Sequence, residues 1–305
     1  MTRPAVSVII VNWNTKDLLA AAIQSVIDTA GKLAIEIIVV DNGSTDGSQA
    51  MLRTRYPLAR LIQNTENVGF ARANNQGASQ AHGEYLLLLN SDAALYRGTL
   101  QALLDVMKAH PKAGLVGAHL RNTDGSFQAS HTPFPNLRQE FLILSGLGRA
   151  IYGSQYPSRG PEETLGPQKV DYVEGACMLL RAEAYRQVGG LDEGYFMYAE
   201  EVDLCYTLQR HGWEVWYQPA ARVLHHGGGS SRNRRTSREG DLYQSRVRFF
   251  RKNYGHWQAE VLKAQIYLIT LVKWGVHGML RLLTGGRRGR PVISPLRLIR
   301  YLSRA

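Results

Sequence analysis

The chain has 305 residues, enough for one large domain or two ordinary domains with a substantial buried core. Hydrophobic residues make up 44% of the chain and charged residues 20%, values that exclude a wholly disordered protein. The formal net charge of +11 raises the hypothesis of a protein that binds nucleic acid or an anionic membrane surface.

The positive charge is concentrated at one end of the chain. Residues 1–245 hold 23 basic and 24 acidic side chains, whereas residues 246–305 hold 13 basic side chains and one acid, Glu260, a net charge of +12. The sequence therefore predicts a near-neutral globular body followed by a basic tail. The two cysteines, Cys177 and Cys205, are too few for a disulfide framework, and we expect buried thiols.

Short apolar runs alternate with helical periodicity over the first 120 residues. Strands are predicted at 6–11, 35–40, 58–63, 85–89 and 114–119, and helices near 16–29, 48–55, 69–81 and 97–110. This alternation predicts an α/β domain with a mostly parallel sheet.

The regular pattern is interrupted after residue 120. Residues 121–170 are rich in Gly, Pro, Ser and Arg, which predicts a long, partly mobile excursion typical of a lid or binding loop. A strand over 172–180 and helices near 182–188 and 200–211 are predicted to follow.

Polar side chains stand where three of the predicted strands end. Asn12 and Asn14 follow the first strand, Asp41 the second, and Asp92 the strand at 85–89. Ligands of such sheets bind beyond the carboxyl ends of the strands. These residues could instead form turns or cap helices, but three polar ends in one half-domain favour a binding site.

Seven short motifs occur in order along the chain, at 6–14, 40–48, 67–75, 88–92, 189–193, 200–204 and 225–228. Each motif alone is weak, and their specificity comes from joint occurrence. In these motifs the chain resembles the inverting, nucleotide-sugar-dependent glycosyltransferases of family 2, and most closely their rhamnosyltransferase-like branch, over about residues 5–230.

The resemblance implies an architecture. The fold expected is GT-A, a Rossmann-like, mostly parallel α/β sheet with a C-terminal helical extension. A catalytic domain is expected over residues 1–240, with its nucleotide-binding part at about 1–120 and its acceptor part at about 121–240. Residues 241–305 then form a basic, amphipathic helical tail.

The resemblance also implies a donor site. Asp41 would accept a hydrogen bond from the nucleotide base, although it could merely cap the turn at 43–48, a duty for which Asn42 and Asp46 are better suited. Many relatives carry Arg where this chain has Asn74. The residues expected at the donor are Asn12, Asn14, Asp41, Asn67, Gly69, Asn74, Asn75 and Ser91.

A divalent cation, Mg²⁺ or Mn²⁺, is expected at the donor diphosphate, because oxygen ligands and a cation offset the charge of this leaving group. Residues 90–92 stand where the family has an Asp-x-Asp metal motif, with Asn90 in place of the first Asp. Asp92 is the expected ligand. His225 is the second, since its segment resembles the one that closes over the diphosphate; the alternative is a surface loop with incidental histidines.

Transfer needs a base that takes the proton of the acceptor hydroxyl. By resemblance this base is Glu201, with Glu200 beside it; both acids could instead be charges favoured at a helix N-terminus, which suits Glu200 better. Asp192, Glu193 and Asp203 are expected near the acceptor. We therefore expect Glu201→Gln to abolish transfer and to leave donor binding intact.

The basic tail contains a predicted helix over 257–284. Its longest uncharged stretch has nine residues, 264–272, whereas a membrane span needs about 20, so no span is predicted. Four polar residues recur on one stripe of an otherwise apolar helix, the pattern of an interfacial helix. They are Lys263, Thr270, His277 and Arg281.

A second amphipathic segment is predicted at 295–304. It places Arg297, Arg300 and Arg304 on one face, and basic clusters beside apolar helices favour anionic lipid. We therefore expect residues 257–305 to contact an anionic membrane surface. The alternative is a tail that packs on the body or on a partner in a homodimer.

The sequence predicts a metal-dependent glycosyltransferase that acts with inversion at the inner, cytoplasmic face of the cell membrane. The first choice of donor is dTDP-rhamnose, with galactose, glucose and N-acetylhexosamine donors open, and the acceptor is a polyprenyl-diphosphate-linked cell-surface glycan. One alternative is a non-catalytic relative that binds glycan or nucleotide. A nucleic-acid-binding protein is disfavoured, because the tail mixes Arg with aliphatic residues rather than with stacking aromatic residues.

Overall fold

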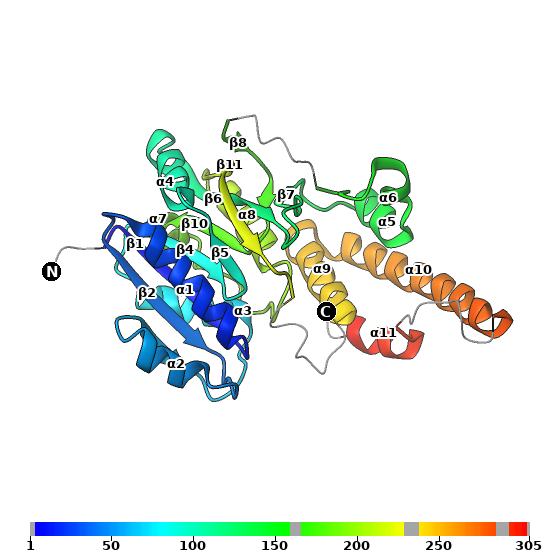
Figure 1. The fold of residues 1–305 in the computed structure, drawn as a ribbon. Helices are drawn as coiled ribbons and strands as arrows, with labels where there is room; N and C mark the ends of the chain where they lie inside the picture. The colour runs from blue at the N-terminus through cyan, green and yellow to red at the C-terminus, as the bar shows by residue number, and fades with distance from the viewer. Residues whose placement is uncertain (1–3, 159–165, 229–237, 285–292, 304–305) are drawn as a thin grey trace. The chain divides into compact units, whose positions relative to one another are not determined.

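The computed structural model describes residues 4–158, 166–228, 238–284 and 293–303. They group into two units (Figure 1). Unit 1 comprises Met1–Phe134, Ser158–Phe196 and Glu200–Asn233, and unit 2 comprises Pro135–Pro157, Met197–Ala199 and Arg234–Ala305. Unit 2 thus contains the expected tail and adds residues 135–157, 197–199 and 234–240, which were expected in the catalytic domain.

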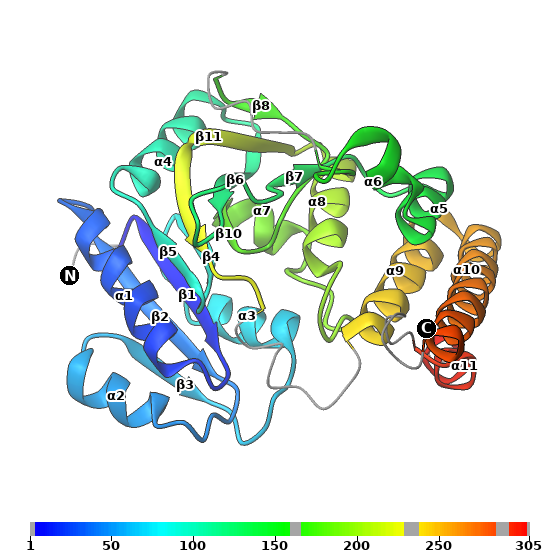
Figure 2. The same cartoon turned by 45° about the vertical axis from the view of Figure 1, so that its right-hand side comes forward.

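Unit 1 is built on a mixed, mostly parallel sheet, which Figures 1 and 2 show from two sides. In the described part of the chain the strand order is β3-β2-β1-β4-β10-β6-β11-β5, with β8 beside β11, and β7 and β9 form a separate pair. The strands are β1 (Val6–Asn12), β2 (Ile35–Asp41), β3 (Arg60–Gln63), β4 (Tyr85–Asn90), β5 (Ala93–Leu95), β6 (Ala113–Arg121), β7 (His131–Thr132), β8 (Gln168–Lys169), β9 (Tyr172–Val173), β10 (Cys177–Arg181) and β11 (Glu214–His225).

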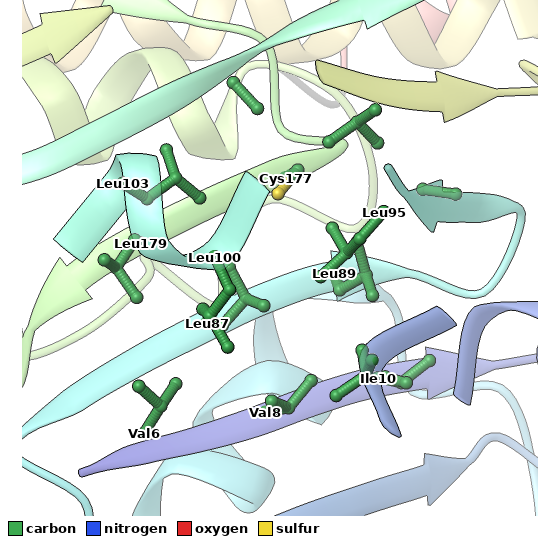
Figure 3. Packing of buried hydrophobic residues seen from close by; sticks show 14 of the residues in the cluster. Val6, Val8, Ile10, Leu87, Leu89, Leu95, Leu100, Leu103, Cys177 and Leu179 are labelled. Carbon is green, nitrogen blue, oxygen red and sulfur yellow. The ribbon is translucent and has the colours of Figure 1, made fainter. Parts of the chain in front are cut away.

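Helices cover both faces of this sheet, which is why its central strands are mostly apolar. On β1, Val6, Val8 and Ile10 pack toward one face (Figure 3), and Ile9 packs toward the other. The first face carries α1 (Lys16–Ala30), α2 (Ser48–Arg55) and α4 (Thr99–Ala109); the second carries α3 (Phe70–Ser79), α7 (Ala182–Gln187) and α8 (Glu200–Arg210).

The strand register brings the predicted polar ends together. Strands β1, β2 and β4 are neighbours and parallel, with Asn12 opposite Asp41 and Val11 opposite Asn90. The polar ends of these three strands therefore lie at one edge of the sheet, although they come from distant segments of the chain.

Strand β11 is the main element of unit 1 that the sequence analysis does not contain. Pro219 stands inside it, and the pairing with β6 shifts register between Gln218 and Arg222. Proline is tolerated in a sheet at such irregularities, but it hides the strand from a periodicity search. The strand matters for the site because it pairs with β5 and sets His225 opposite Ala93.

Two helices occupy part of the region expected to be an irregular excursion, so that expectation is wrong for α5 (Leu137–Ser145) and α6 (Leu147–Tyr152). The side chain of Asn136 caps α5 by accepting from the Gln139 amide at 2.9 Å. Gly146 follows it with φ 84°, a conformation that glycine adopts at low cost. Cap and glycine are sequence signals that would have revealed this helix.

The other helices of unit 2 are α9 (Arg238–Tyr254), α10 (His256–Leu283) and α11 (Pro295–Leu302), and α10 packs against α5, α9 and α11. A buried ion pair joins the two sequence segments of this unit: Arg246 Nη1 on α9 lies 2.6 Å from Glu140 Oε2 on α5. Burial raises the pKa of the Glu140 carboxyl, and Arg246 opposes that shift. Loss of either partner would leave a buried polar group unpaired.

Candidate active site

A chain of buried hydrogen bonds links the carboxyl ends of β1, β2 and β4. Thr15 Oγ1 donates to Asn12 Oδ1 at 2.8 Å, so its bond of 2.8 Å with Ser91 Oγ has Ser91 as the donor. Asn12 Nδ2 donates to Asp41 Oδ2 at 2.8 Å. The structure therefore brings together three of the residues expected at the donor, Asn12, Asp41 and Ser91, in one network.

Asp41 is the centre of this network and is 0% exposed. Its Oδ1 accepts from the Ser44 amide at 2.9 Å and from Gln49 Nε2 at 2.8 Å. Asp41 thus stabilises the turn at 43–48, as the alternative to a nucleotide-binding role requires. Asp46 also stabilises this turn, because its Oδ1 accepts from the Ser48 amide at 3.0 Å. A contact between Asp41 and a nucleotide base stays a prediction.

Asn14 connects the loop after β1 to the turn after β2. Its backbone has φ 53°, a left-handed conformation that asparagine tolerates better than most residues. Its side-chain Oδ1 accepts from the Thr45 backbone amide at 2.7 Å, and its backbone amide donates to Ser44 Oγ at 2.9 Å. The two loops that would flank a nucleotide are therefore tied to each other.

The segment before α3 reaches the segment before α8. Asn67 Oδ1 accepts from the Gly69 amide at 3.0 Å, and the Phe70 amide donates to the Phe196 carbonyl at 3.0 Å. Gly69 has φ 93°, and a Cβ there would lie 2.8 Å from that carbonyl. Only glycine fits, so the glycine that the sequence analysis assigns to the donor site also permits this close backbone contact.

Asn74 and Asn75 are occupied by contacts within the protein. Asn74 is 1% exposed and donates to the Phe70 carbonyl one turn earlier. Asn75 binds the Leu191 backbone twice, at 2.8 Å and 3.0 Å, and accepts from Tyr185 Oη at 2.6 Å. Both residues thus hold structure beside the site, and a direct role in donor binding stays a prediction.

The acidic pair Asp192 and Glu193, which follows Leu191, is also held by contacts within the protein. Glu193 binds Arg72 Nε at 3.0 Å and Asn75 Nδ2 at 3.1 Å, and Asp192 Oδ1 accepts from the Gly194 amide at 2.8 Å. The sequence analysis did not single out Arg72, whose position one turn from Asn75 on α3 was the available signal. A role for Asp192 and Glu193 at the acceptor stays a prediction.

Asp92 and His225, the two expected metal ligands, lie close together, and a cation shared between them stays a prediction. Because β11 pairs with β5, His225 Nε2 lies 3.3 Å from Asp92 Oδ1 and 3.4 Å from Asn90 Nδ2, although Asn90 and His225 are 135 residues apart in sequence. The His226 amide also donates to the Asp92 carbonyl at 3.0 Å.

The donor set at this point fits a divalent cation. The described residues contain no cluster of three or more His, Cys, Asp or Glu side chains suited to a metal. However, Asn90 Oδ1 is buried and has no hydrogen-bond partner among the described residues, so the residue whose Nδ2 lies 3.4 Å from His225 also has an unused amide oxygen. Mg²⁺ and Mn²⁺ accept such mixed ligands, and substrate phosphates complete their coordination.

Glu200 and Glu201 open α8 after a strained turn, in which Tyr198 and Ala199 have φ 73° and 65°. Glu200 is 5% exposed, and Glu200 Oε2 has no hydrogen-bond partner within the described residues. Burial and the neighbouring Glu201 raise the pKa of Glu200 well above its ordinary value. Glu200 therefore binds its proton more tightly than an ordinary glutamate does, and Glu201, the partly exposed member of the pair, is the candidate base.

Glu201 is partly exposed, and burial raises the pKa of its carboxyl to about 7. A Cβ on Gly175 would lie 3.5 Å from the Glu201 Cβ, so the absence of a side chain at Gly175 leaves room along this face of Glu201. Asp203 is buried and accepts from Tyr195 Oη at 3.3 Å, which suits a structural contact. Its expected role at the acceptor stays a prediction.

A mixed, mostly parallel sheet with helices on both faces and polar groups at the carboxyl edge is the architecture of the GT-A fold. The family model for glycosyl transferase family 2 matches residues 7–189. The chain belongs to this family and is a glycosyltransferase.

Comparison with known proteins agrees on sequence and fold. The chain is 33% identical over 242 residues to an N-acetylglucosaminyl-diphospho-decaprenol L-rhamnosyltransferase of Mycobacterium tuberculosis, covering 73% of this chain and 76% of the relative. Two solved structures share the fold: GalNAc-T7 with UDP, GalNAc and Mn²⁺ (TM-score 0.58, 16% identity, 82% of this chain, 48% of that one) and the Pyrobaculum calidifontis mannosyltransferase PcManGT with GDP-Man and Mn²⁺ (TM-score 0.55, 18% identity, 100% and 86%).

Proposed function

We propose that the enzyme transfers rhamnose, with dTDP-rhamnose as the first-choice donor, to a hydroxyl of a polyprenyl-diphosphate-linked glycan. The similarity to a decaprenol-linked rhamnosyltransferase supports the sugar and the acceptor class. The single observation that carries the chemistry is the Glu200–Glu201 pair, in which a buried carboxyl with a raised pKa stands beside a partly exposed carboxyl whose pKa is raised to about 7. Such a carboxylate is suited to general-base catalysis at neutral pH.

In the proposed reaction the Glu201 carboxylate accepts the proton of the acceptor hydroxyl. The hydroxyl oxygen then attacks the anomeric carbon from the side opposite the diphosphate, forming the new glycosidic bond as the bond to the diphosphate breaks. Because one displacement occurs, the configuration at the anomeric carbon inverts. The products are the extended glycan, the nucleoside diphosphate and a proton on Glu201.

The leaving diphosphate carries the negative charge that develops during the reaction. Asp92, His225 and Asn90 Oδ1 are the groups that would hold a divalent cation, and a bound cation would supply electrostatic stabilisation of that charge. The network of Asn12, Asp41 and Ser91 would orient the nucleotide by fixing the loops around it.

The test is a transfer assay with the full chain, Mn²⁺ or Mg²⁺ and a short polyprenyl-diphosphate N-acetylglucosamine acceptor, with dTDP-rhamnose compared against UDP-galactose, UDP-glucose and UDP-N-acetylglucosamine. We expect a rhamnosylated product whose anomeric configuration, read by NMR, is opposite to that of the donor. Transfer of another sugar in preference would refute the donor, and retained configuration would refute the mechanism.

We also propose that unit 2 brings the enzyme to the inner, cytoplasmic face of an anionic membrane through residues 257–305. The polar stripe expected on α10 is not fully exposed, because Thr270 is buried together with Leu262 and Ile266. Leu282 and Leu283 are instead 86% and 75% exposed. Among the described residues, α10 is long and apolar enough to cross a membrane, and only 11% of its most apolar window is buried. Apolar side chains turned outward beside basic residues suit an interfacial helix.

Vesicle flotation tests this placement. The double variant Leu282→Glu/Leu283→Glu should bind anionic vesicles at least about tenfold more weakly, since each leucine contributes about 1.5–3 kcal/mol when it leaves water. The matched control is Leu58→Glu in unit 1, a leucine that is 98% exposed, and it should bind like the unaltered protein. Equal loss in both variants, or no loss in the double variant, would exclude this surface as the membrane contact.

A further inference from the structure

The second ring nitrogen of His225 has a partner that the sequence analysis did not single out. His225 Nδ1 lies 2.6 Å from Gln128 Oε1. Gln128 comes from the segment after β6. This segment is held to the strand because the backbone amide of Gln128 donates to the Leu120 carbonyl at 2.9 Å. The partner is therefore positioned by the fold and not by a chance contact of a mobile side chain.

The surrounding hydrogen bonds determine which atom of the Gln128 side-chain amide faces the His225 ring. Gln128 Nε2 lies 3.4 Å from the His225 carbonyl and 2.9 Å from Asn122 Oδ1. Asn122 is itself oriented, because its Nδ2 donates to the Phe127 carbonyl at 3.2 Å. Backbone carbonyls only accept, so both amides must turn their NH₂ groups toward them. Gln128 Oε1 is consequently the atom that faces His225, and Nδ1 of the ring must carry a proton.

We propose that Gln128 is a positioning residue that holds His225 in the tautomer whose Nε2 lone pair faces Asp92 and Asn90. This inference deepens the proposed function, since it rests on the assignment of His225 as a ligand of the donor-bound cation. Histidines that bind metals commonly donate their other ring N–H to such an acceptor, which fixes both tautomer and ring orientation. Without Gln128 the ring can rotate or place its proton on Nε2, and the metal-binding lone pair is lost.

The first test is the tautomer itself, measured by ¹⁵N NMR of the histidine rings in the metal-free full chain at alkaline pH, where imidazoles are neutral. The His225 signals are assigned by their disappearance in His225→Gln. We expect the unaltered protein to carry the ring proton on Nδ1 and Gln128→Met, which keeps the side-chain length but removes the acceptor, to lose that preference. A ring proton on Nε2 in the unaltered protein, or an unchanged tautomer in Gln128→Met, would overturn the inference.

The second test is Mn²⁺ affinity, measured by electron paramagnetic resonance in the presence of the nucleoside diphosphate. Gln128→Met should bind Mn²⁺ about 10- to 100-fold more weakly. The matched control is Gln209→Met, which removes an amide bonded to the backbone carbonyls of Val170 and Asp171, and it should bind Mn²⁺ normally. Equal Mn²⁺ affinity in Gln128→Met and the unaltered protein would contradict the positioning role.

The two tests separate this inference from the proposed function. If the unaltered protein shows the Nδ1 proton and Gln128→Met loses it, Gln128 sets the tautomer even where neither protein binds Mn²⁺, and it is then the metal assignment that fails. Circular dichroism and the unfolding midpoint of Gln128→Met establish that the fold is intact. A loss of Mn²⁺ affinity with an unchanged tautomer would count against Gln128 and leave the metal assignment standing.

Discussion

The two ends of the active site satisfy their buried polar groups to different degrees. At the donor end, Asn12 and Asp41 hydrogen-bond with each other and with the neighbouring loops. At the catalytic end, Asn90 Oδ1 and Glu200 Oε2 are buried without a partner among the described residues, and both glutamates of the pair have raised pKa values. The buried polar groups of the donor end are thus already hydrogen-bonded within the protein. At the catalytic end, buried polar groups without partners reduce stability, and substrate and cation would supply those partners.

The largest effect should come from Glu201→Gln. General-base catalysis typically contributes about 10²- to 10⁴-fold, so kcat should fall by that factor while the dissociation constant of the donor changes little. Calorimetry of donor binding and a transfer assay measure the two quantities. Glu183→Gln, at an exposed glutamate on α7, is the control and should be fully active. Substantial turnover in Glu201→Gln would mean that another group is the base.

The pH dependence of transfer should follow the same carboxylate. Burial raises the pKa of Glu201 to about 7, and only the ionised form accepts a proton. At saturating cation, kcat/KM should therefore fall about tenfold per pH unit as the pH drops below that value and level off above it. A rate profile that stays flat from neutral to acidic pH would break the link between the buried pair and the base.

A smaller effect is expected at the donor end, where Asn12→Ala removes the residue that joins Asp41 to Thr15 in the hydrogen-bond chain. Asp41 and Thr15 would each lose a buried partner, which typically costs about 1–3 kcal/mol of unfolding free energy. Urea unfolding measures the change, with Gln24→Ala on the surface of α1 as a control expected near zero. An Asn12→Ala protein as stable as the control would show that this hydrogen-bond network does not stabilise the folded protein.

The smallest effect has the opposite sign. Because the pKa of Glu200 is raised in the folded protein, the folded state binds this proton more tightly than the unfolded chain, and stability falls as the pH rises above the ordinary range of Glu. Glu200→Gln cannot ionise, so it should be more stable at pH about 8, by about 0.5–2 kcal/mol, and equal to the unaltered protein at pH about 4. Unfolding curves at both pH values test this, and destabilisation at pH about 8 would refute the strained character of the catalytic end.

The elements with a clear local apolar pattern were predictable. Strand β1 and helix α1 lie within a residue or two of their expected bounds, because a short apolar run marks a strand buried on both faces and apolar residues at helical spacing mark a helix. Strand β11 escaped because Pro219 and a register shift break its pattern. Helix α5 escaped because its region was judged by composition, although its cap at Asn136 was visible.

The sequence by itself determined the family, the α/β alternation and the polar ends of β1, β2 and β4, because these depend on local pattern and on motif order. Only the tertiary structure decided which polar groups are satisfied. The side-chain amides of Asn74 and Asn75 hydrogen-bond to backbone groups. Glu200 Oε2 is buried without a hydrogen-bond partner among the described residues, and Gln128 contacts His225. Such contacts join residues far apart in sequence, and their geometry follows from strand pairing and close packing that no local pattern records.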